Sequence, residues 1–266
     1  MTENTFEAIA GRSVGEAGSG SVPASDRKSD AENPLLFLCD HASNRLPEGA
    51  LGLDPGLLAT HIAYDIGAAA LTRALALTYD APAFLGGWSR LLIDLNRGAD
   101  DPTLVMKLSD GSIIPGNARA DAGEVARRIA HYHAPYHAAI DAALDRMGPQ
   151  AVVVSMHSFT PAWKGRPRPW EVGVLYDRDT RLSVPLMARL GRAGFTVGDN
   201  EPYSGALEGD TLYQHGTLRG LPHVLIEIRQ DLIASEGAAQ AFASRLHPIL
   251  DAALADMRRA DMHRQG

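Results

Sequence analysis

Two histidines in this chain directly follow apolar runs. His41 comes one residue after the run Leu35 to Cys39, and His157 follows the run Ala151 to Met156. Short runs of this composition indicate buried strands. Open α/β sheets bind ligands beyond the carboxyl ends of their strands, so we expect both histidines at one edge of a sheet. A single histidine after a strand is more often structural, but two in the same context favour a site for a divalent metal.

Two carboxylate residues occur among apolar residues, where a carboxylate is unexpected. Glu227 lies inside the apolar run Leu221 to Ile228, where burial of an unpaired carboxylate is costly and raises its pKa. It is either the partner of a distant arginine or a general base that acts on water beside a metal. Asp65 lies in a segment with helical spacing, from Asp54 to Leu77, and either faces solvent or points at the site.

The segment Ser89 to Arg97 concentrates groups that bind anions. Its pattern predicts a strand with Arg90 and Arg97 near its ends and Asn96 beside the second arginine. Charged ends of a strand can simply be solvated. They also match an anionic substrate, because a guanidinium group binds a carboxylate through two parallel hydrogen bonds.

A glycine-bearing segment from Gly209 to Gly220 contains Tyr213 and His215. Its composition predicts a mobile lid, and either side chain could close over a bound substrate.

The amphipathic helix predicted over Asp121 to Met147 carries further histidines. His133 and His137 have the i, i+4 spacing of helical zinc motifs. The glutamate that accompanies such motifs is missing, however, and Pro135 lies between the two histidines and disturbs the helix. We therefore interpret them as partly buried structural residues, one of which could line the pocket.

Composition narrows the class of protein. The net charge of -7 argues against nucleic acid as a partner, because binding to a phosphate backbone depends on clustered Lys and Arg. A small-molecule substrate fits better. The one cysteine, Cys39, cannot form an internal disulfide, and it lies in an apolar run where a thiol packs as a small hydrophobe. A nucleophilic role for it beside His41 is the weaker alternative. Without a long apolar stretch or a signal-like N-terminus, we expect a cytoplasmic protein with no membrane association.

One large α/β domain is expected over residues 34–266, because 45% hydrophobic composition is ample for a core. Residues 1–33 have little to bury, so we expect a flexible or loosely packed arm. Further patterns predict strands over Ala81 to Trp88 and Glu171 to Tyr176, a loop or hairpin over Pro102 to Asn117, and helices over Leu182 to Ala193 and from Ala234 to the end.

Seven short motifs, in order, resemble the N-formylglutamate amidohydrolase (N-formylglutamate deformylase) family: CDHASNRLP, HIAYDIGA, SRLLIDLNR, IPGN, the PYH of the long helix, SMHSF and LIEIRQD. They span about Pro34 to Asp231. That family looks distantly similar to zinc carboxypeptidases and aspartoacylase-type deacylases. The resemblance implies a three-layer α/β/α fold with a mixed, largely parallel sheet, and one divalent metal ion, with zinc expected.

The resemblance also implies a role for each residue that matches a motif. It implies metal ligation by His41 and His157, polarisation of the scissile carbonyl by Arg90, binding of the substrate carboxylate by Asn96 and Arg97, and acid–base catalysis by Glu227. The chain departs from the carboxypeptidase pattern His-x-x-Glu, because Asn44 stands three residues after His41. An amide is a poorer zinc ligand than a carboxylate, so Asp65 is our first candidate for the third ligand and Asn44 the second.

Three functions are therefore open. The first is metal-dependent hydrolysis of an N-acyl amino acid, with N-formyl-L-glutamate as the expected substrate. The second is a related metallo-amidase or peptidase that acts on another acyl amino acid or a cell-wall peptide. The third is a non-catalytic module that binds a carboxylated ligand.

Overall fold

A central sheet of seven strands organises the computed structural model, which describes residues 5–11 and 35–265. The strands run in the order β1-β3-β2-β6-β11-β9-β10. Their bounds are β1 Phe6–Ile9, β2 Leu35–Cys39, β3 Ala83–Gly86, β6 Val152–Phe159, β9 Val172–Leu175, β10 Val197–Asp199 and β11 His223–Arg229. The four central strands β3, β2, β6 and β11 are parallel. At the edges, β1 pairs antiparallel with β3, and β9 pairs antiparallel with β11 and parallel with β10. The predicted mixed, largely parallel sheet is confirmed.

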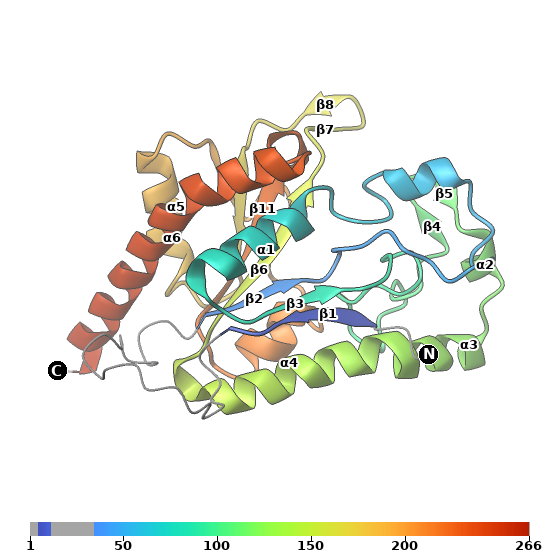
Figure 1. Ribbon diagram of the computed structural model, residues 1–266, viewed down its shortest axis with the longest axis horizontal. Helices are drawn as coiled ribbons and strands as arrows, with labels where there is room; N and C mark the ends of the chain where they lie inside the picture. Colours follow the sequence, from blue (N-terminus) through green and yellow to red (C-terminus); the bar gives the residue numbers. More distant parts are fainter. Residues whose placement is uncertain (1–4, 12–34, 266) are drawn as a thin grey trace, which may run out of the picture.

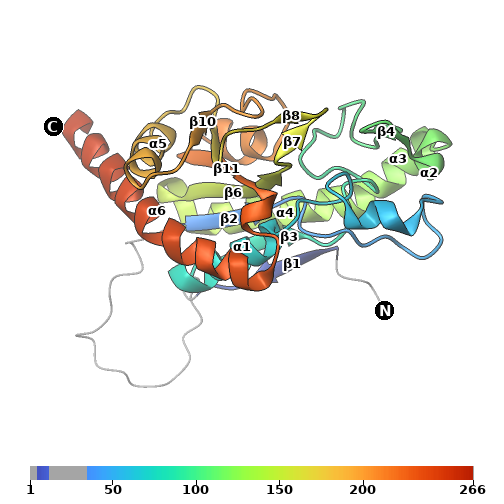
Figure 2. The same ribbon diagram turned by 90° about the horizontal axis from the view of Figure 1, so that it is seen from above.

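Helices cover both faces of this sheet, as predicted for a three-layer α/β/α fold. Figure 1 shows α1 (Ala68–Tyr79), α5 (Ser183–Arg192) and α6 (Glu236–Gln265) on one side and α4 (Ala134–Met147) on the other. The short helices α2 (Pro115–Ala118) and α3 (Ala122–Arg128) precede α4. Two small hairpins lie outside this sheet, β4–β5 (Leu108–Ser109, Ser112–Ile113) and β7–β8 (Ala162–Trp163, Arg166–Pro167). In both views β4 lies toward one end of the molecule and β7–β8 nearer its middle (Figure 1, Figure 2).

Burial on both faces explains why the strands are apolar without alternation. In β2, Leu35, Phe37 and Cys39 belong to the core on the side of α1 and α6. Leu36 and Leu38 belong to the core on the side of α4. Side chains alternate between the two faces of a strand, and both faces of β2 are covered. All five side chains are therefore buried. Burial also raises the pKa of the Cys39 thiol, and this argues against a nucleophilic role for it.

The first part of the chain differs from its predicted arm. Residues 6–9 form β1, which pairs antiparallel with β3 at the edge of the sheet. Phe6 packs against Phe84 and Tyr136, so this segment has apolar surface to bury after all. The prediction of a loose arm is wrong for residues 6–9, and its stretch from 12 to 33 lies outside the described residues.

The predicted strand over Ser89 to Arg97 is wrong, because the segment folds as consecutive turns. Polar side chains replace the partners that a sheet would supply. Ser89 Oγ accepts a hydrogen bond from the backbone N–H of Leu91, and Asp94 Oδ1 accepts one from Asn96. Such local bonds compete with strand pairing.

The helix predicted from Asp54 is divided. Pro55–Ala59 is a 3-10 helix capped by Asp54, and α1 begins only at Ala68. Asp65 therefore lies in the connection before α1. Gly67 makes the turn into α1 with φ 82°, and a Cβ at this position would lie 2.1 Å from the Ile233 carbonyl oxygen.

The helix predicted over Asp121 to Met147 is present, but its middle is a π-helical turn, Ile129–His133. Pro135 has no N–H to donate, and it follows this turn in the first turn of α4, where none is needed. Within the described residues, no helix is both long and apolar enough to cross a membrane.

Candidate active site

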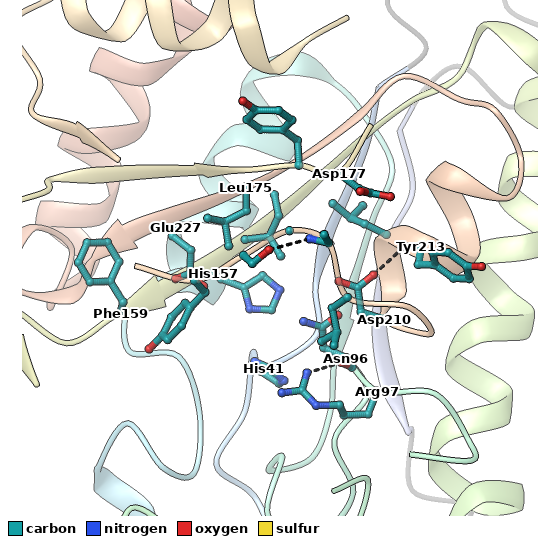
Figure 3. Close-up of a pocket in the computed structure, with 18 of the residues that line it drawn as sticks. His41, Asn96, Arg97, His157, Phe159, Leu175, Asp177, Asp210, Tyr213 and Glu227 are labelled. Carbon is teal, nitrogen blue, oxygen red and sulfur yellow. Dashed lines mark hydrogen bonds between the residues drawn. The ribbon is translucent and has the colours of Figure 1, made fainter. Parts of the chain in front are cut away.

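Three adjacent strands carry the centre of the site. His41 lies just beyond β2, while His157 and Glu227 lie near the carboxyl ends of β6 and β11 and are direct neighbours in the register of that pair. All three are buried. They line one cavity of about 420 Å³, into which Figure 3 shows the two imidazoles projecting. The prediction that the two histidines meet at one sheet edge is confirmed.

Asp65 lies between the two histidines. Its Oδ2 is 2.8 Å from Nδ1 of His157 and 3.4 Å from Nδ1 of His41. One nitrogen from each histidine and one oxygen from Asp65 all lie within 4.8 Å of one another, a grouping that could hold a metal ion. Two imidazoles and one carboxylate form a donor set that suits zinc and leaves a fourth position open. The backbone N–H of Asp65 donates to the His41 carbonyl (3.0 Å), which brings the two residues together.

Asn44 is not part of this group. Its Nδ2 donates to the Leu58 carbonyl oxygen (2.8 Å), and it lines a separate surface hollow instead of the cavity. The amide group of Asn44 thus bonds to the main chain of the 3-10 helix Pro55–Ala59 and not to a group in the cavity. The second candidate for the third ligand is therefore wrong, and the described residues offer Asp65 in its place.

Behind each histidine lies a buried aspartate that sequence reasoning missed. Nε2 of His41 lies 2.6 Å from Oδ1 of Asp94, and Nε2 of His157 lies 3.2 Å from Oδ2 of Asp40. A carboxylate on the far nitrogen keeps the proton there and leaves Nδ1 free to bind a metal. The sequence does carry a signal for Asp94, because this residue interrupts an apolar run in the same way as Glu227 does.

The charges of this cluster are mutually supporting. Burial disfavours the ionised form of Asp40, but hydrogen bonds and charge from His157, together with the Tyr136 hydroxyl, lower its pKa to about 2. Burial also opposes ionisation of Asp65 and Asp94, yet the surrounding histidines and Arg90 keep the pKa of both below the ordinary value. The carboxylates are thus anions ready to bind cations.

Arg90 is fixed at the edge of the cluster. Its Nη2 donates to Oδ2 of Asp94 (3.0 Å), and its Nη1 lies 3.5 Å from Oδ1 of Asp65. The side chain is 22% exposed and lines the cavity, so part of the guanidinium group faces the space that a substrate would fill.

Asn96 and Arg97 also line the cavity, on the side of His41 (Figure 3). Oδ1 of Asn96 accepts the backbone N–H of Thr211 (3.0 Å), which orients its amide. Arg97 donates to the carbonyl oxygen of Asn96 (2.7 Å) and to Oγ1 of Thr103 (3.3 Å). The Arg97 side chain is 25% exposed, so a carboxylate can reach it from the cavity.

Glu227 differs from Asp40, Asp65 and Asp94 because its carboxyl group makes no hydrogen bond or ion pair within the described part of the chain. Its Oε2 is fully enclosed and has no hydrogen-bond partner among the described residues. Burial and the neighbouring charge of Asp65 outweigh the opposing effects of His157, His41 and Arg90, and raise the pKa of Glu227 to about 7. A carboxyl group with this pKa can both take and return a proton near neutral pH.

Gly209 to Gly220, the segment predicted as a mobile lid, borders the cavity. The segment contains a π-helical turn, Tyr213–Thr217, and it is packed into the protein, with Thr211 fully buried. Asp210 Oδ1 accepts the backbone N–H of Tyr213 (2.6 Å) and fixes the start of the turn. Tyr213 lines the cavity, although Figure 3 shows its ring directed away from His41 and His157. His215 is buried against other side chains and does not line the cavity.

The fold and site together define an α/β enzyme of the amidohydrolase class. The family model of N-formylglutamate amidohydrolase matches residues 33–234, and the chain belongs to this family. The resemblance seen in the sequence is confirmed.

The chain is similar to solved structures that include the following two. A gene product of Agrobacterium tumefaciens is 37% identical, with 85% of this chain and 92% of that chain covered and a TM-score of 0.81. The N-formylglutamate amidohydrolase of Ralstonia eutropha JMP134 is 22% identical, with 98% and 99% covered and a TM-score of 0.63, a likeness of fold. No curated protein matches the chain.

Proposed function

We propose that this amidohydrolase is metal-dependent and hydrolyses N-formyl-L-glutamate to formate and L-glutamate. The observation that carries the proposal is the convergence of His41, Asp65 and His157 opposite the unpaired carboxyl group of Glu227. The two nitrogens and one oxygen suit one zinc ion with an open position. Held there, the ion would polarise the scissile carbonyl and acidify a water molecule.

Glu227 performs the proton transfers. It takes a proton from the attacking water as the water oxygen bonds to the formyl carbon, and it gives that proton to the nitrogen as the C–N bond breaks. Arg90 faces the same space and offers guanidinium N–H groups to the oxyanion that develops on the former carbonyl oxygen. One donor of this kind typically contributes about 3–4 kcal/mol to transition-state stabilisation.

Two arginines account for a substrate with two carboxylates. Arg97, with Asn96, binds the α-carboxylate and so orients the amide bond toward Glu227. Arg178 also lines the cavity, is exposed, and has no hydrogen bond or ion pair within the described part of the chain. We assign it to the side-chain carboxylate of glutamate.

The test is a substrate panel on metal-stripped and zinc-reconstituted protein. The panel contains N-formyl-L-glutamate, N-formyl-L-glutamine, N-acetyl-L-glutamate and a cell-wall peptide. We expect hydrolysis of the first to exceed that of the others and to require zinc. Full activity after chelation would overturn the metal dependence. Preference for the peptide or an acetyl substrate would instead favour the related metallo-amidase or peptidase. Family membership speaks against the non-catalytic module.

A further inference from the structure

Two π-helical turns each contribute a histidine to one buried cluster. One, Ile129–His133, ends on His133, and the other, Tyr213–Thr217, contains His215. The third histidine is His137 of α4, whose ring is nearly parallel to that of His215 with centroids 5.1 Å apart and lies 4.2 Å from the His133 ring. All three histidines are buried and none lines the cavity. Because π-helical turns recur at functional sites, this arrangement requires an explanation beyond packing.

The histidines contact the main chain of the proposed carboxylate-binding segment. Nε2 of His133 lies 2.8 Å from the Arg97 carbonyl oxygen, and Nε2 of His137 lies 3.0 Å from that of Leu95. A carbonyl oxygen can only accept, so each ring must carry its proton on Nε2. The two carbonyls flank Asn96. The Oγ1 of Thr211 donates to the same Leu95 carbonyl oxygen (3.1 Å).

His215 fixes the proton on His137. Nδ1 of His137 lies 2.8 Å from Nε2 of His215. Because the Nε2 proton of His137 is committed to Leu95, its Nδ1 accepts the N–H of His215. Burial, together with the neighbouring rings, lowers the pKa of His137 to about 3, so this ring is neutral near pH 7. On the outer side, Asp141 lies 3.1 Å from Nδ1 of His215 and accepts from Arg219.

We propose that His133 and His137, the latter oriented by His215, are positioning residues that hold Asn96 and Arg97 in the geometry that binds the substrate carboxylate. This inference rests on the proposed function for the role of that pair. The histidines touch main chain and not substrate, so they act through Asn96 and Arg97. The carboxylate does not react, so most of its binding energy is present in the ground state and in the transition state alike. Its loss therefore raises KM far more than it lowers kcat.

A matched pair of variants tests the proposal. In His133→Gln the amide N–H reaches about as far as Nε2 of histidine, whereas in His133→Asn it is too short to reach Arg97. We expect His133→Asn to raise KM for N-formyl-L-glutamate about tenfold with kcat within about threefold, and His133→Gln to restore KM. His131→Asn is the control, because His131 is exposed on the same helix and its ring packs edge-on against the Tyr132 ring.

Hydrogen–deuterium exchange of residues 94–98 supplies a readout that needs no substrate. We expect faster exchange in His133→Asn than in wild type and in His133→Gln. The thermal unfolding midpoint of each protein is measured alongside the exchange. If the wild type fails to hydrolyse N-formyl-L-glutamate, the proposed function fails while the exchange result still tests the positioning role. Unchanged exchange and KM in His133→Asn, or a fall in kcat alone, would overturn the inference.

Discussion

Oδ2 of Asp65 lies 2.8 Å from Nδ1 of His157, although 92 residues separate them. This contact makes Asp65 the carboxylate of the proposed metal site, in the role that Asn44 would fill if the ligand came three residues after His41. The same oxygen also faces His41, so Asp65 is shared between the two histidines. The first prediction tests this sharing.

Replacing Asp65 by Asn should remove most of the zinc affinity, because an anionic ligand becomes a neutral amide. The loss should exceed the roughly 10–100-fold that removal of an outer-sphere partner costs. Zinc affinity is measured by competition with a chromogenic chelator. Asn44→Ser is the control and should retain wild-type affinity, because Asn44 bonds to the Leu58 carbonyl. Zinc loss in Asn44→Ser with retention in Asp65→Asn would contradict the assignment.

Replacing Glu227 by Gln should lower kcat by about 10²- to 10⁴-fold, because the amide cannot take a proton from water. Zinc content should not change, since Glu227 is assigned as a base and not as a ligand. Glu208→Gln is a suitable control, because Glu208 also lines the cavity but is exposed. Steady-state kinetics measure kcat, and elemental analysis of the same preparations measures the zinc content. Retained turnover in Glu227→Gln would exclude the proposed base.

Replacing Arg178 by Gln should raise KM for N-formyl-L-glutamate by about fivefold. An exposed ion pair contributes roughly 1 kcal/mol, which corresponds to a change of about fivefold in affinity. N-formyl-L-glutamine, which has no side-chain carboxylate, should show no change. Arg166→Gln is the matched control, because Arg166 is exposed but does not line the cavity. An equal effect of Arg178→Gln on both substrates would place the side-chain carboxylate elsewhere.

Burial of His137 should make its contribution to stability fall in mild acid. Unfolded His137 takes up a proton as the pH falls below 6.5, whereas folded His137 does so only near 3. The unfolded state thus binds more protons in this window, and the free energy of unfolding falls with decreasing pH by up to about 1.4 kcal/mol per unit. Above pH 6.5 this contribution is fully present.

Urea unfolding at pH 7.0, 6.0 and 5.0 measures that slope. Burial also lowers the pKa of His133, so this ring contributes in the same direction. His137→Gln, which cannot titrate, should flatten the dependence relative to wild type, whatever its absolute stability. An unchanged slope in that variant would show that His137 is not protonated differently in the two states.

Local patterns in the sequence determined much of the architecture. The apolar runs that form β2, β6 and β11 could be predicted because strands buried on both faces must be apolar throughout. The same runs placed His41, His157 and Glu227, since polar residues at strand ends or inside strands stand out against such surroundings. The family resemblance then supplied the expected roles.

Tertiary structure decided which polar groups share a site. Asp65 and Asp94 reach the histidines from connections that are remote in sequence, and no spacing rule encodes such contacts. Ser89 to Arg97 was predicted as a strand because the sequence shows its apolar residues. The side-chain hydrogen bonds that hold its turns form only in the folded protein. The burial of His215 away from the cavity could not be predicted for the same reason, since its hydrogen-bond partner, His137, is 78 residues away. Sequence periodicity specifies local burial, whereas pairings between distant polar atoms exist only after the chain has packed.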